Sequence, residues 1–296
     1  MKISFTIIFI LIKTALLCQT FLRPHDSLIK AHHIKKIFVY TIDSTKKELN
    51  RKKQIPQNQY IYQFDSTGNI ELEERFWGYK GWRGNSWTSV EKETRKYFYE
   101  NNRLKSRVVT APYNLDTSTY TYDRKNRLLK VESNSYYLEN TGYVLISKRI
   151  IRYEYPRKTI TVVREEEYYS RWAIPDKQKI FYDTLVYNRK KQLLMDMSGR
   201  TGLKTSYKYN SQNQLILKLY VTKRQDTIIW TNENKFIYKD NRLIHEEEKL
   251  TSEKNSENNR THFFEYIYDE KGLLQITNRP QFAFPFNTLF YRYEYY

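Results

Sequence analysis

Apolar and polar residues alternate in short segments over most of this chain. Residues 146–155, Ile-Ser-Lys-Arg-Ile-Ile-Arg-Tyr-Glu-Tyr, and residues 159–164, Thr-Ile-Thr-Val-Val-Arg, show partial period-two patterning and are rich in β-branched residues. This pattern is typical of strands that turn one face toward a core. No stretch of a dozen residues shows the apolar stripe of an amphipathic helix. We therefore expect strands throughout, with a helical turn or two only within residues 23–36.

One aromatic phrase recurs among these segments and predicts a hairpin. Its fullest copy, residues 120–129, reads Tyr-Thr-Tyr-Asp-Arg-Lys-Asn-Arg-Leu-Leu, and residues 266–274 repeat it closely. Aromatic residues at i and i+2 share one face of a strand, and the Asp that follows can accept backbone N–H bonds that start a turn. Three residues beyond the Asp stands Asn126 or Gly272. Both types tolerate the positive φ of the bulge residue that closes a type I turn.

The number of copies predicts the architecture. A copy that begins at Tyr60 has two extra residues before its Asp65. Other copies begin at Tyr97, Val186, Tyr207 and Phe236, and shortened copies lie at Tyr153 and Tyr291. A unit repeated on this scale usually buries its apolar face only against its neighbours. We predict an all-β fold, an antiparallel hairpin meander that forms a long twisted sheet, curled into a partial barrel or a short β-solenoid.

The phrase Tyr-x-Tyr-Asp-x-x-Gly/Asn-x-Leu resembles the repeat of the bacterial YD, or Rhs, family. Similar phrases cover residues 60–296, and those at Tyr120 and Tyr266 match best. In large members of the family, the resemblance implies, strand hairpins wind into a hollow shell that can enclose a toxic C-terminal domain. This chain has too few copies to close such a shell and ends in a strand-like segment at Tyr295-Tyr296. The resemblance therefore implies the hairpin architecture and a cell-envelope setting, without the toxin function.

The first residues predict export. Met1-Lys2 precedes the apolar run from Ile3 to Ile12, and Lys13 interrupts that run before Cys18. A basic residue at the N-terminus followed by a short apolar run is typical of a secretory signal peptide, and the run is too short to span a bilayer comfortably. We assign residues 1–18 to the signal peptide, 19–59 to an N-terminal segment with the first strand or strands, and 60–296 to the repeat domain. The protein then reaches the periplasm, the outer surface or the medium.

Cys18 is the single cysteine of the chain. Attachment of a lipid to Cys18 is one alternative, but Leu17 stands where a lipoprotein signal expects a small residue. Cleavage near Cys18-Gln19 is the other alternative, and it leaves a mature chain without disulfides. Packing and strand pairing must then supply the stability of the exported protein.

Composition favours strands and a positive surface field. The chain has 28 Tyr and 15 Phe, residues that suit half-buried pleated surfaces. Its net charge is +18, with 51 Lys and Arg scattered among 33 Asp and Glu. Mixed signs at this density are typical of the solvated face of a sheet and argue against specific nucleic-acid recognition. The excess of positive charge still predicts attraction to polyanions such as acidic glycans.

The sequence offers little for catalysis. The five histidines form no metal-binding spacing such as His-Glu-x-x-His, and the adjacent pair His32-His33 is expected to be exposed. Nucleophile elbows and phosphate-binding loops are also missing, so we predict no enzyme, no cofactor and no metal. Two acidic triplets, 165–167 and 246–248, could suggest the paired carboxylates of a glycoside hydrolase. Neighbouring Arg164, Arg171 and Lys249 favour cross-strand charge pairs on a solvated face instead.

A segment rich in tryptophan and glycine interrupts the repeats and is the predicted ligand site. Residues 75–87 hold three of the five tryptophans and three of the eight glycines. Exposed rings on a flexible loop can stack on sugar faces, and adjacent basic residues suit an acidic glycan. The alternative is that the rings fold back and cap an open end of the sheet. The predicted ligand-binding residues are Trp77, Tyr79, Lys80, Trp82, Arg83 and Trp87.

These observations give three functional hypotheses. The first is a non-enzymatic envelope or secreted protein that binds or scaffolds, with an anionic surface polymer or glycan as its partner. The second is an accessory or orphan protein of an Rhs-type system that binds a protein partner by adding a strand at an exposed edge. The third is an enzyme that acts on cell-wall glycan. None of the three requires a transmembrane span.

Overall fold

The computed structural model describes residues 26–41, 57–80, 87–169, 179–224, 227–252, 257, 259–278 and 288–296. These residues form one short helix, α2 (Asp26–Ala31), and one 18-stranded sheet. The strands are β1 (Ile34–Thr41), β2 (Gln57–Phe64), β3 (Ile70–Lys80), β4 (Trp87–Glu100), β5 (Arg103–Thr110), β6 (Asn114–Tyr122), β7 (Leu128–Glu139), β8 (Gly142–Arg157), β9 (Ile160–Tyr169), β10 (Lys179–Tyr187), β11 (Leu193–Met197), β12 (Lys204–Tyr209), β13 (Leu215–Arg224), β14 (Thr227–Lys239), β15 (Arg242–Ser252), β16 (Arg260–Tyr268), β17 (Leu274–Asn278) and β18 (Thr288–Tyr295). The prediction of an all-β chain with a short helix within 23–36 is confirmed.

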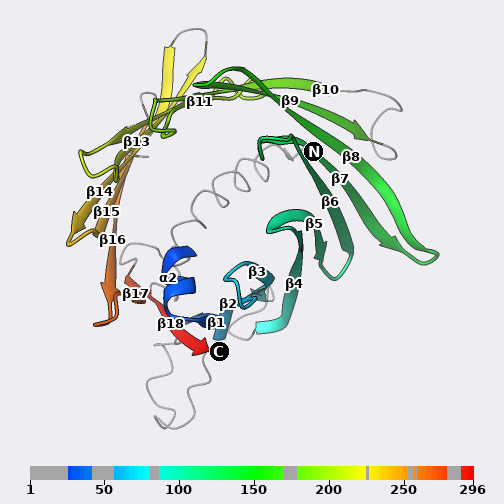
Figure 1. Ribbon diagram of the computed structural model, residues 1–296, viewed down its shortest axis with the longest axis horizontal. Coiled ribbons are helices and arrows are strands. Elements are labelled where there is room, and N and C mark those ends of the chain that lie inside the picture. Colours follow the sequence, from blue (N-terminus) through cyan, green and yellow to red (C-terminus); the bar gives the residue numbers. More distant parts are fainter. Residues whose placement is uncertain are drawn as a thin grey trace.

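The sheet closes into a barrel. Each strand from β2 to β17 pairs antiparallel with the strands before and after it in the chain, which confirms the hairpin meander. β1 pairs with both β2 and β18, so Phe38 lies opposite Ile61 on one side and Arg292 on the other. Figure 1 looks into this ring of strands. The structure is consistent with the predicted curling of the sheet and is more specific, because the strands form a closed barrel.

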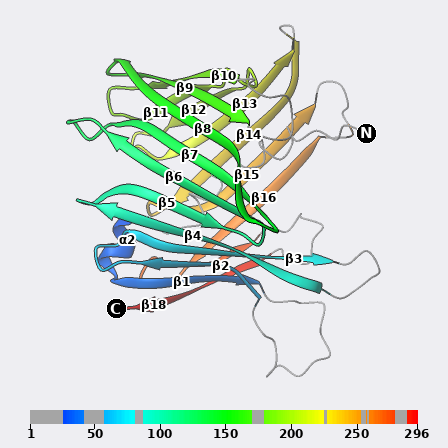
Figure 2. The ribbon, with the colours of Figure 1, turned by 90° about the vertical axis from the view of Figure 1, so that its right-hand side faces the viewer.

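The two rims of the barrel differ. The turns that follow the aromatic phrases connect β2 to β3, β4 to β5 and so on, and because the strands alternate in direction they all lie at one rim. We call this the turn rim. Both α2 and the C-terminus lie at the same end of the barrel (Figure 2). The backbone N–H of Tyr296 donates to the carbonyl oxygen of His33 at 2.9 Å, which joins the C-terminus to the residues after α2.

The apolar core occupies one part of the interior. Figure 1 shows α2 inside the ring, beside β18, β1 and β2, and Ile29 of this helix is only 1% exposed. The buried core residues are Ile29, Ile34, Ile37, Val39, Tyr62, Phe64, Ile70, Phe236, Leu243, Phe264, Tyr266, Leu273, Leu274, Leu289 and Tyr291. The core thus joins Ile29 of α2 to residues of β1–β3 and β14–β18.

Charged residues follow both faces of the sheet. On the outer face, Lys130 and Lys148 flank Glu132 from the same and the adjacent strand, at 3.0 and 2.5 Å. Pairs of this kind in the middle of strands are typical of a face in contact with water. On the inner face, Glu73 is 5% exposed and lies opposite the core residue Tyr62. No helix in the described part of the chain is long and apolar enough to cross a membrane.

Candidate functional site

The turn rim is built from one local hydrogen-bond pattern. In the turn after β6, the Asp123 carboxylate accepts the backbone N–H groups of Lys125 and Arg127, each at 2.8 Å. The backbone N–H of Asn126 donates to the carbonyl oxygen of Asp123 at 3.1 Å, and Asn126 has a φ of +65°. This is the predicted type I turn closed by a left-handed residue. The left-handed residues of the five turns of this kind are Gly68, Asn126, Lys191, Asn213 and Gly272.

The other turns of the rim depart from this pattern. The copies at Tyr97 and Phe236 lead into two-residue turns, Asn101-Asn102 and Asp240-Asn241, in which both residues have positive φ. These are the dihedral signs of a type I′ hairpin. The first copy also differs from its predicted alignment. The β-bulge of β2 falls between Gln63 and Phe64, directly before Asp65, so its aromatic pair is Tyr62 and Phe64 and no extra residues precede the Asp.

The second tyrosine of five of the phrases joins neighbouring hairpins. Tyr122 donates its hydroxyl to the carbonyl oxygen of Leu104 at 3.1 Å, and Tyr268 donates to that of Leu243 at 2.9 Å. In each case the acceptor is a leucine at the start of the strand that follows the previous turn. The same bond runs from Tyr155 to Leu128, from Tyr209 to Leu193 and from Tyr293 to Leu274. The shortened copies therefore keep this function although their downstream half is missing.

Side chains also join the turns to one another around the rim. Lys190 Nζ donates to Asn213 Oδ1 in the next turn at 3.1 Å, and Gln214 Nε2 donates to Asn241 Oδ1 in the turn after that at 3.3 Å. Arg127 places its guanidinium 4.4 Å from the centre of the Tyr155 ring. These contacts join neighbouring turns along part of the rim.

Four adjacent turns of this surface carry a concentration of positive charge, which we call the basic arc. They connect β4 to β5, β6 to β7, β8 to β9 and β10 to β11. The exposed basic residues of the arc are Arg103, Arg124, Lys125, Arg127, Arg157, Lys158, Arg189, Lys190 and Lys191. Residues 101–103, 123–127, 157–159 and 188–192 contain a single carboxylate, Asp123.

Asp123 offsets only one of the nine positive charges of the arc, and its carboxylate is paired with Arg127. The backbone N–H of Arg127 is the main cause that lowers the pKa of the Asp123 carboxyl, and the Arg127 side chain adds to it. Arg127 Nε lies 2.6 Å from Asp123 Oδ2. Within the described residues, Arg124, Lys125, Arg189 and Lys191 have no ion-pair partner. The remaining turns of the rim, 65–69, 210–214, 240–242 and 269–273, hold two basic and four acidic residues, so the positive charge belongs to one side of the rim.

The sequence alone did not reveal the basic arc. The basic residues look scattered along the chain, because the turns that carry them are separated by 19 to 29 residues. A signal was present in the repeated phrase itself. Aligned on their Asp or Asn, the copies at Tyr120 and Val186 place basic residues at the first two positions of the turn, as Arg124-Lys125 and Arg189-Lys190.

The first acidic triplet is divided between the two faces of the sheet, so the prediction of a solvated face is wrong for two of its three residues. Glu165, Glu166 and Glu167 are all buried, each no more than 5% exposed. Tyr97 of β4 packs against the core, so its side chain faces the interior. Residues directly opposite one another on neighbouring strands share a face of the sheet. From Tyr97, the opposite residues on β5 to β9 are Arg107, Ser118, Ser133, Arg149 and Glu167. Glu165 and Glu167 therefore face the interior, and only Glu166 points outward.

Charge pairing within the first triplet is as expected, but it involves an unpredicted partner. Arg200, from the loop between β11 and β12, donates to both Glu165 and Glu167. Arg149 Nε lies 2.8 Å from Glu165 Oε1. On the outer face, the hydroxyl of Tyr168 is the main cause that lowers the pKa of Glu166. Arg164 Nε lies 3.2 Å from the same carboxylate.

The second triplet also departs from the solvated face. Glu246 lies opposite the core residues Phe236 and Phe264, so it faces inward. Its carboxylate accepts the Asn234 amide at 3.0 Å and the Tyr266 hydroxyl at 2.8 Å. These bonds fix Glu246 within the wall of the barrel.

The predicted tryptophan-rich site lies at the rim opposite the turn rim. Trp77, Tyr79 and Lys80 end β3, and Trp87 begins β4, with Lys80 opposite Trp87 in the ladder. Trp82 and Arg83 lie outside the described residues. Strand pairing brings Trp77, Tyr79, Lys80 and Trp87 together at one hairpin. The ligand surface and the cap both stay predictions.

Metal binding has no support in the described residues, where no group of three or more His, Cys, Asp or Glu is placed to hold an ion. His33 has a φ of +49° and its carbonyl oxygen binds the C-terminal residue. His25 and the predicted signal peptide with Cys18 lie outside the described residues.

No family model and no curated protein matches this chain. A protein of unknown function from Bacteroides fragilis is 17% identical over 45% of this chain and 93% of its own, with a TM-score of 0.27. A porin-like protein from Bacteroides uniformis is 10% identical over 88% and 98%, with a TM-score of 0.30. The Photorhabdus luminescens Tc holotoxin pore is 11% identical over 81% of this chain and 16% of its own, with a TM-score of 0.23. Similarity at this level carries no functional argument, and the resemblance to YD/Rhs repeats stays a prediction.

Proposed function

We propose that this protein is a non-enzymatic exported protein, of the cell envelope or secreted, that binds an anionic surface polymer or glycan through the basic arc. The observation that carries the proposal is the set of nine exposed basic residues on four adjacent turns with one carboxylate among them. Scattered charges on a solvated face would alternate in sign around the rim. Here they gather on one side of it.

The geometry of the arc suits an extended partner. Neighbouring strands lie about 4.8 Å apart, so consecutive turns at this rim are about 10 Å apart and four turns span about 30 Å. A row of cations on this scale matches a linear polymer with repeated negative charges better than a small anion. Dissolved ions screen the attraction between exposed charges. The binding should therefore weaken strongly as the salt concentration rises.

The other two hypotheses receive less support. Strand addition needs a free edge, and each described strand has a partner on both sides because β1 pairs with β18. A hydrolase needs carboxylates that can reach a substrate, whereas Glu165 and Glu167 are both bonded to Arg200. We therefore retain polymer binding as the single proposed function.

The test compares two variants with equal net charge. The arc variant replaces Arg124, Lys125, Arg189 and Lys191 by Gln. The matched control replaces Lys96, Lys204, Lys208 and Lys249 by Gln, four exposed lysines of the outer face. Each variant lowers the formal charge from +18 to +14, since four positive charges are removed. Binding to heparin and to alginate is measured by isothermal titration calorimetry from 50 to 500 mM NaCl.

We expect the wild type and the control to bind with similar affinity and a steep dependence on salt. The arc variant should bind about 100- to 1000-fold more weakly, if each basic residue contributes about 1 kcal/mol, as it does beside an anionic membrane surface. Equal losses in both variants would show that net charge alone attracts the polymer, and the proposed site would be wrong. A third variant, Trp77→Ala, tests the tryptophan-rich hairpin, and a loss there with an intact arc would move the site to the opposite rim.

A further inference from the structure

A hollow of about 660 Å³ opens beside the basic arc at the turn rim. It lies between the turn 210–214 and the turn 240–241, and its volume is within the range of small-molecule sites. Lys190 of the arc donates to Asn213 of the first of these turns at 3.1 Å. The hollow is therefore the next feature along the rim from the arc.

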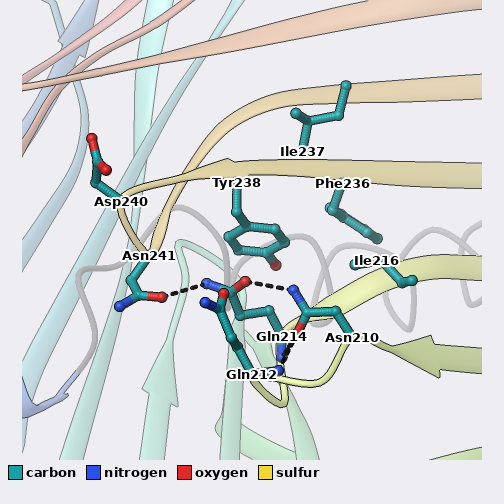
Figure 3. Close-up of a pocket in the computed structure, with 9 residues that line it drawn as sticks. All are labelled: Asn210, Gln212, Gln214, Ile216, Phe236, Ile237, Tyr238, Asp240 and Asn241. Carbon is teal, nitrogen blue, oxygen red and sulfur yellow. Dashed lines mark hydrogen bonds between the residues drawn. The ribbon is translucent and has the colours of Figure 1, made fainter.

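One tyrosine that leaves the general pattern lies in this hollow. Tyr209 and Tyr268, in the neighbouring phrases, donate their hydroxyls to the carbonyl oxygens of Leu193 and Leu243. Tyr238 occupies the same place in its own phrase, but no hydrogen bond of its hydroxyl is found within the described residues. Its ring lines the hollow together with Ile216 and Phe236 (Figure 3).

Polar groups face this apolar side. Figure 3 shows the amide side chains of Asn210, Gln212 and Gln214 opposite Tyr238, while Ile237 points away from them. Asn210 Nδ2 donates to Gln214 Oε1 at 2.7 Å, and Gln214 in turn donates to Asn241, which fixes this row of amides.

Several polar groups of the lining remain available to a ligand. Within the described residues, the side chains of Gln212 and Asp240 have no hydrogen-bond partner, and the Asn241 amide nitrogen donates to none. Together with the Tyr238 hydroxyl they supply donors and acceptors around one apolar wall.

We propose that this hollow binds one uncharged sugar residue of the polymer that the basic arc holds. A sugar ring offers hydroxyl groups, each both donor and acceptor, and an apolar C–H face, which match the amides and the tyrosine ring. The carboxylate of Asp240 is the only charge in the lining, so it repels an acidic sugar unit and favours a neutral one. This inference rests on the proposed function and narrows the partner to an acidic polysaccharide that also contains neutral units.

The test uses neutral disaccharides, which the basic arc cannot attract. Cellobiose, maltose, lactose and N,N′-diacetylchitobiose are titrated against the full chain, and binding is followed by saturation-transfer NMR. Two variants, Gln212→Ala and Asp240→Asn, alter groups without a partner among the described residues, so the fold should survive, as a thermal melt will verify. Glu270→Gln, which removes one exposed carboxylate from a turn of the same rim, is the matched control.

We expect the wild type and the Glu270→Gln variant to bind at least one disaccharide, and the two hollow variants to bind it at least tenfold more weakly. Heparin retention should be unchanged in Gln212→Ala, and no variant of this set should retain heparin more weakly than the wild type. Absence of binding to all four disaccharides by the wild type, or equal binding by the hollow variants, would overturn this inference. If the wild type binds a disaccharide but the arc variant retains full heparin affinity, the proposed function fails while the sugar site stands.

Discussion

The tyrosine hydroxyls that join neighbouring hairpins should contribute a measurable share of the stability of the barrel. Replacement of Tyr268 by Phe removes only the hydroxyl that donates to Leu243 at 2.9 Å and leaves the ring in place. A hydrogen bond of this kind contributes about 1 kcal/mol to the free energy of unfolding. We therefore expect Tyr268→Phe to lower that free energy by about 1 kcal/mol.

The effect should accumulate along the sheet. Tyr122, Tyr155, Tyr209, Tyr268 and Tyr293 each make the same bond, with oxygen–oxygen distances from 2.5 to 3.1 Å. The variant with all five replaced by Phe should lose about 5 kcal/mol, which equals the whole stability of many domains. Each bond joins a different pair of hairpins, so we expect the losses to add approximately.

The chain supplies its own control for this measurement. Tyr238 has the same place in its hairpin, but its hydroxyl donates to no carbonyl oxygen within the described residues. Tyr238→Phe should therefore change the free energy of unfolding by no more than about 0.3 kcal/mol. Urea denaturation followed by tryptophan fluorescence measures all the variants. Equal losses in Tyr238→Phe and Tyr268→Phe, or no loss in either, would refute the reasoning, because ring packing alone would then explain the phrase.

Three further outcomes are expected. Arg200→Ala should lower the free energy of unfolding by about 2–3 kcal/mol, because two carboxylates lose their donor inside the wall, and Glu165→Gln added to it should recover part of the loss in urea denaturation. Lys191→Asn should raise the melting temperature slightly, since φ is +64° and Asn tolerates this conformation better than Lys. The pKa of Asp123 is lowered in the folded state, so its stabilising effect is complete above the ordinary value of 3.8 and is lost as pH falls below it. Asp123→Asn should therefore flatten the acid limb of a stability–pH curve, and an unchanged limb would contradict that account.

Much of the local structure could be predicted from the sequence because the forces that form it act over a few residues. Asp123 and Asn126 form their turn through bonds within five residues of chain, and such chemistry is readable from residue types. The alternation that predicted strands at 146–155 and 159–164 is likewise local, and β8 and β9 occupy these segments. Lys191 could not be predicted in this way, because it adopts a left-handed conformation that lysine rarely adopts.

The faces of the sheet could not be assigned from the sequence. Glu165 and Glu246 stand among charged neighbours, which suggested solvent, yet both face the interior of the barrel. There they bond to Arg200 and to Tyr266, which come from other strands or loops. A pattern of period two tells which residues share a face but does not tell which face is inside.

The sequence by itself determined the hairpin, its turn residues and the one-sided placement of its aromatic rings, because neighbours along the chain make these contacts. The tertiary structure alone decided that the sheet closes, since closure requires Phe38 to meet Arg292, residues at opposite ends of the chain. Closure also bends the row of turns into a ring, so the basic residues of neighbouring turns form an arc on one side of the rim. The sheet closes because the twist and the register of all its strands add up around the barrel. No single segment of the sequence determines that total.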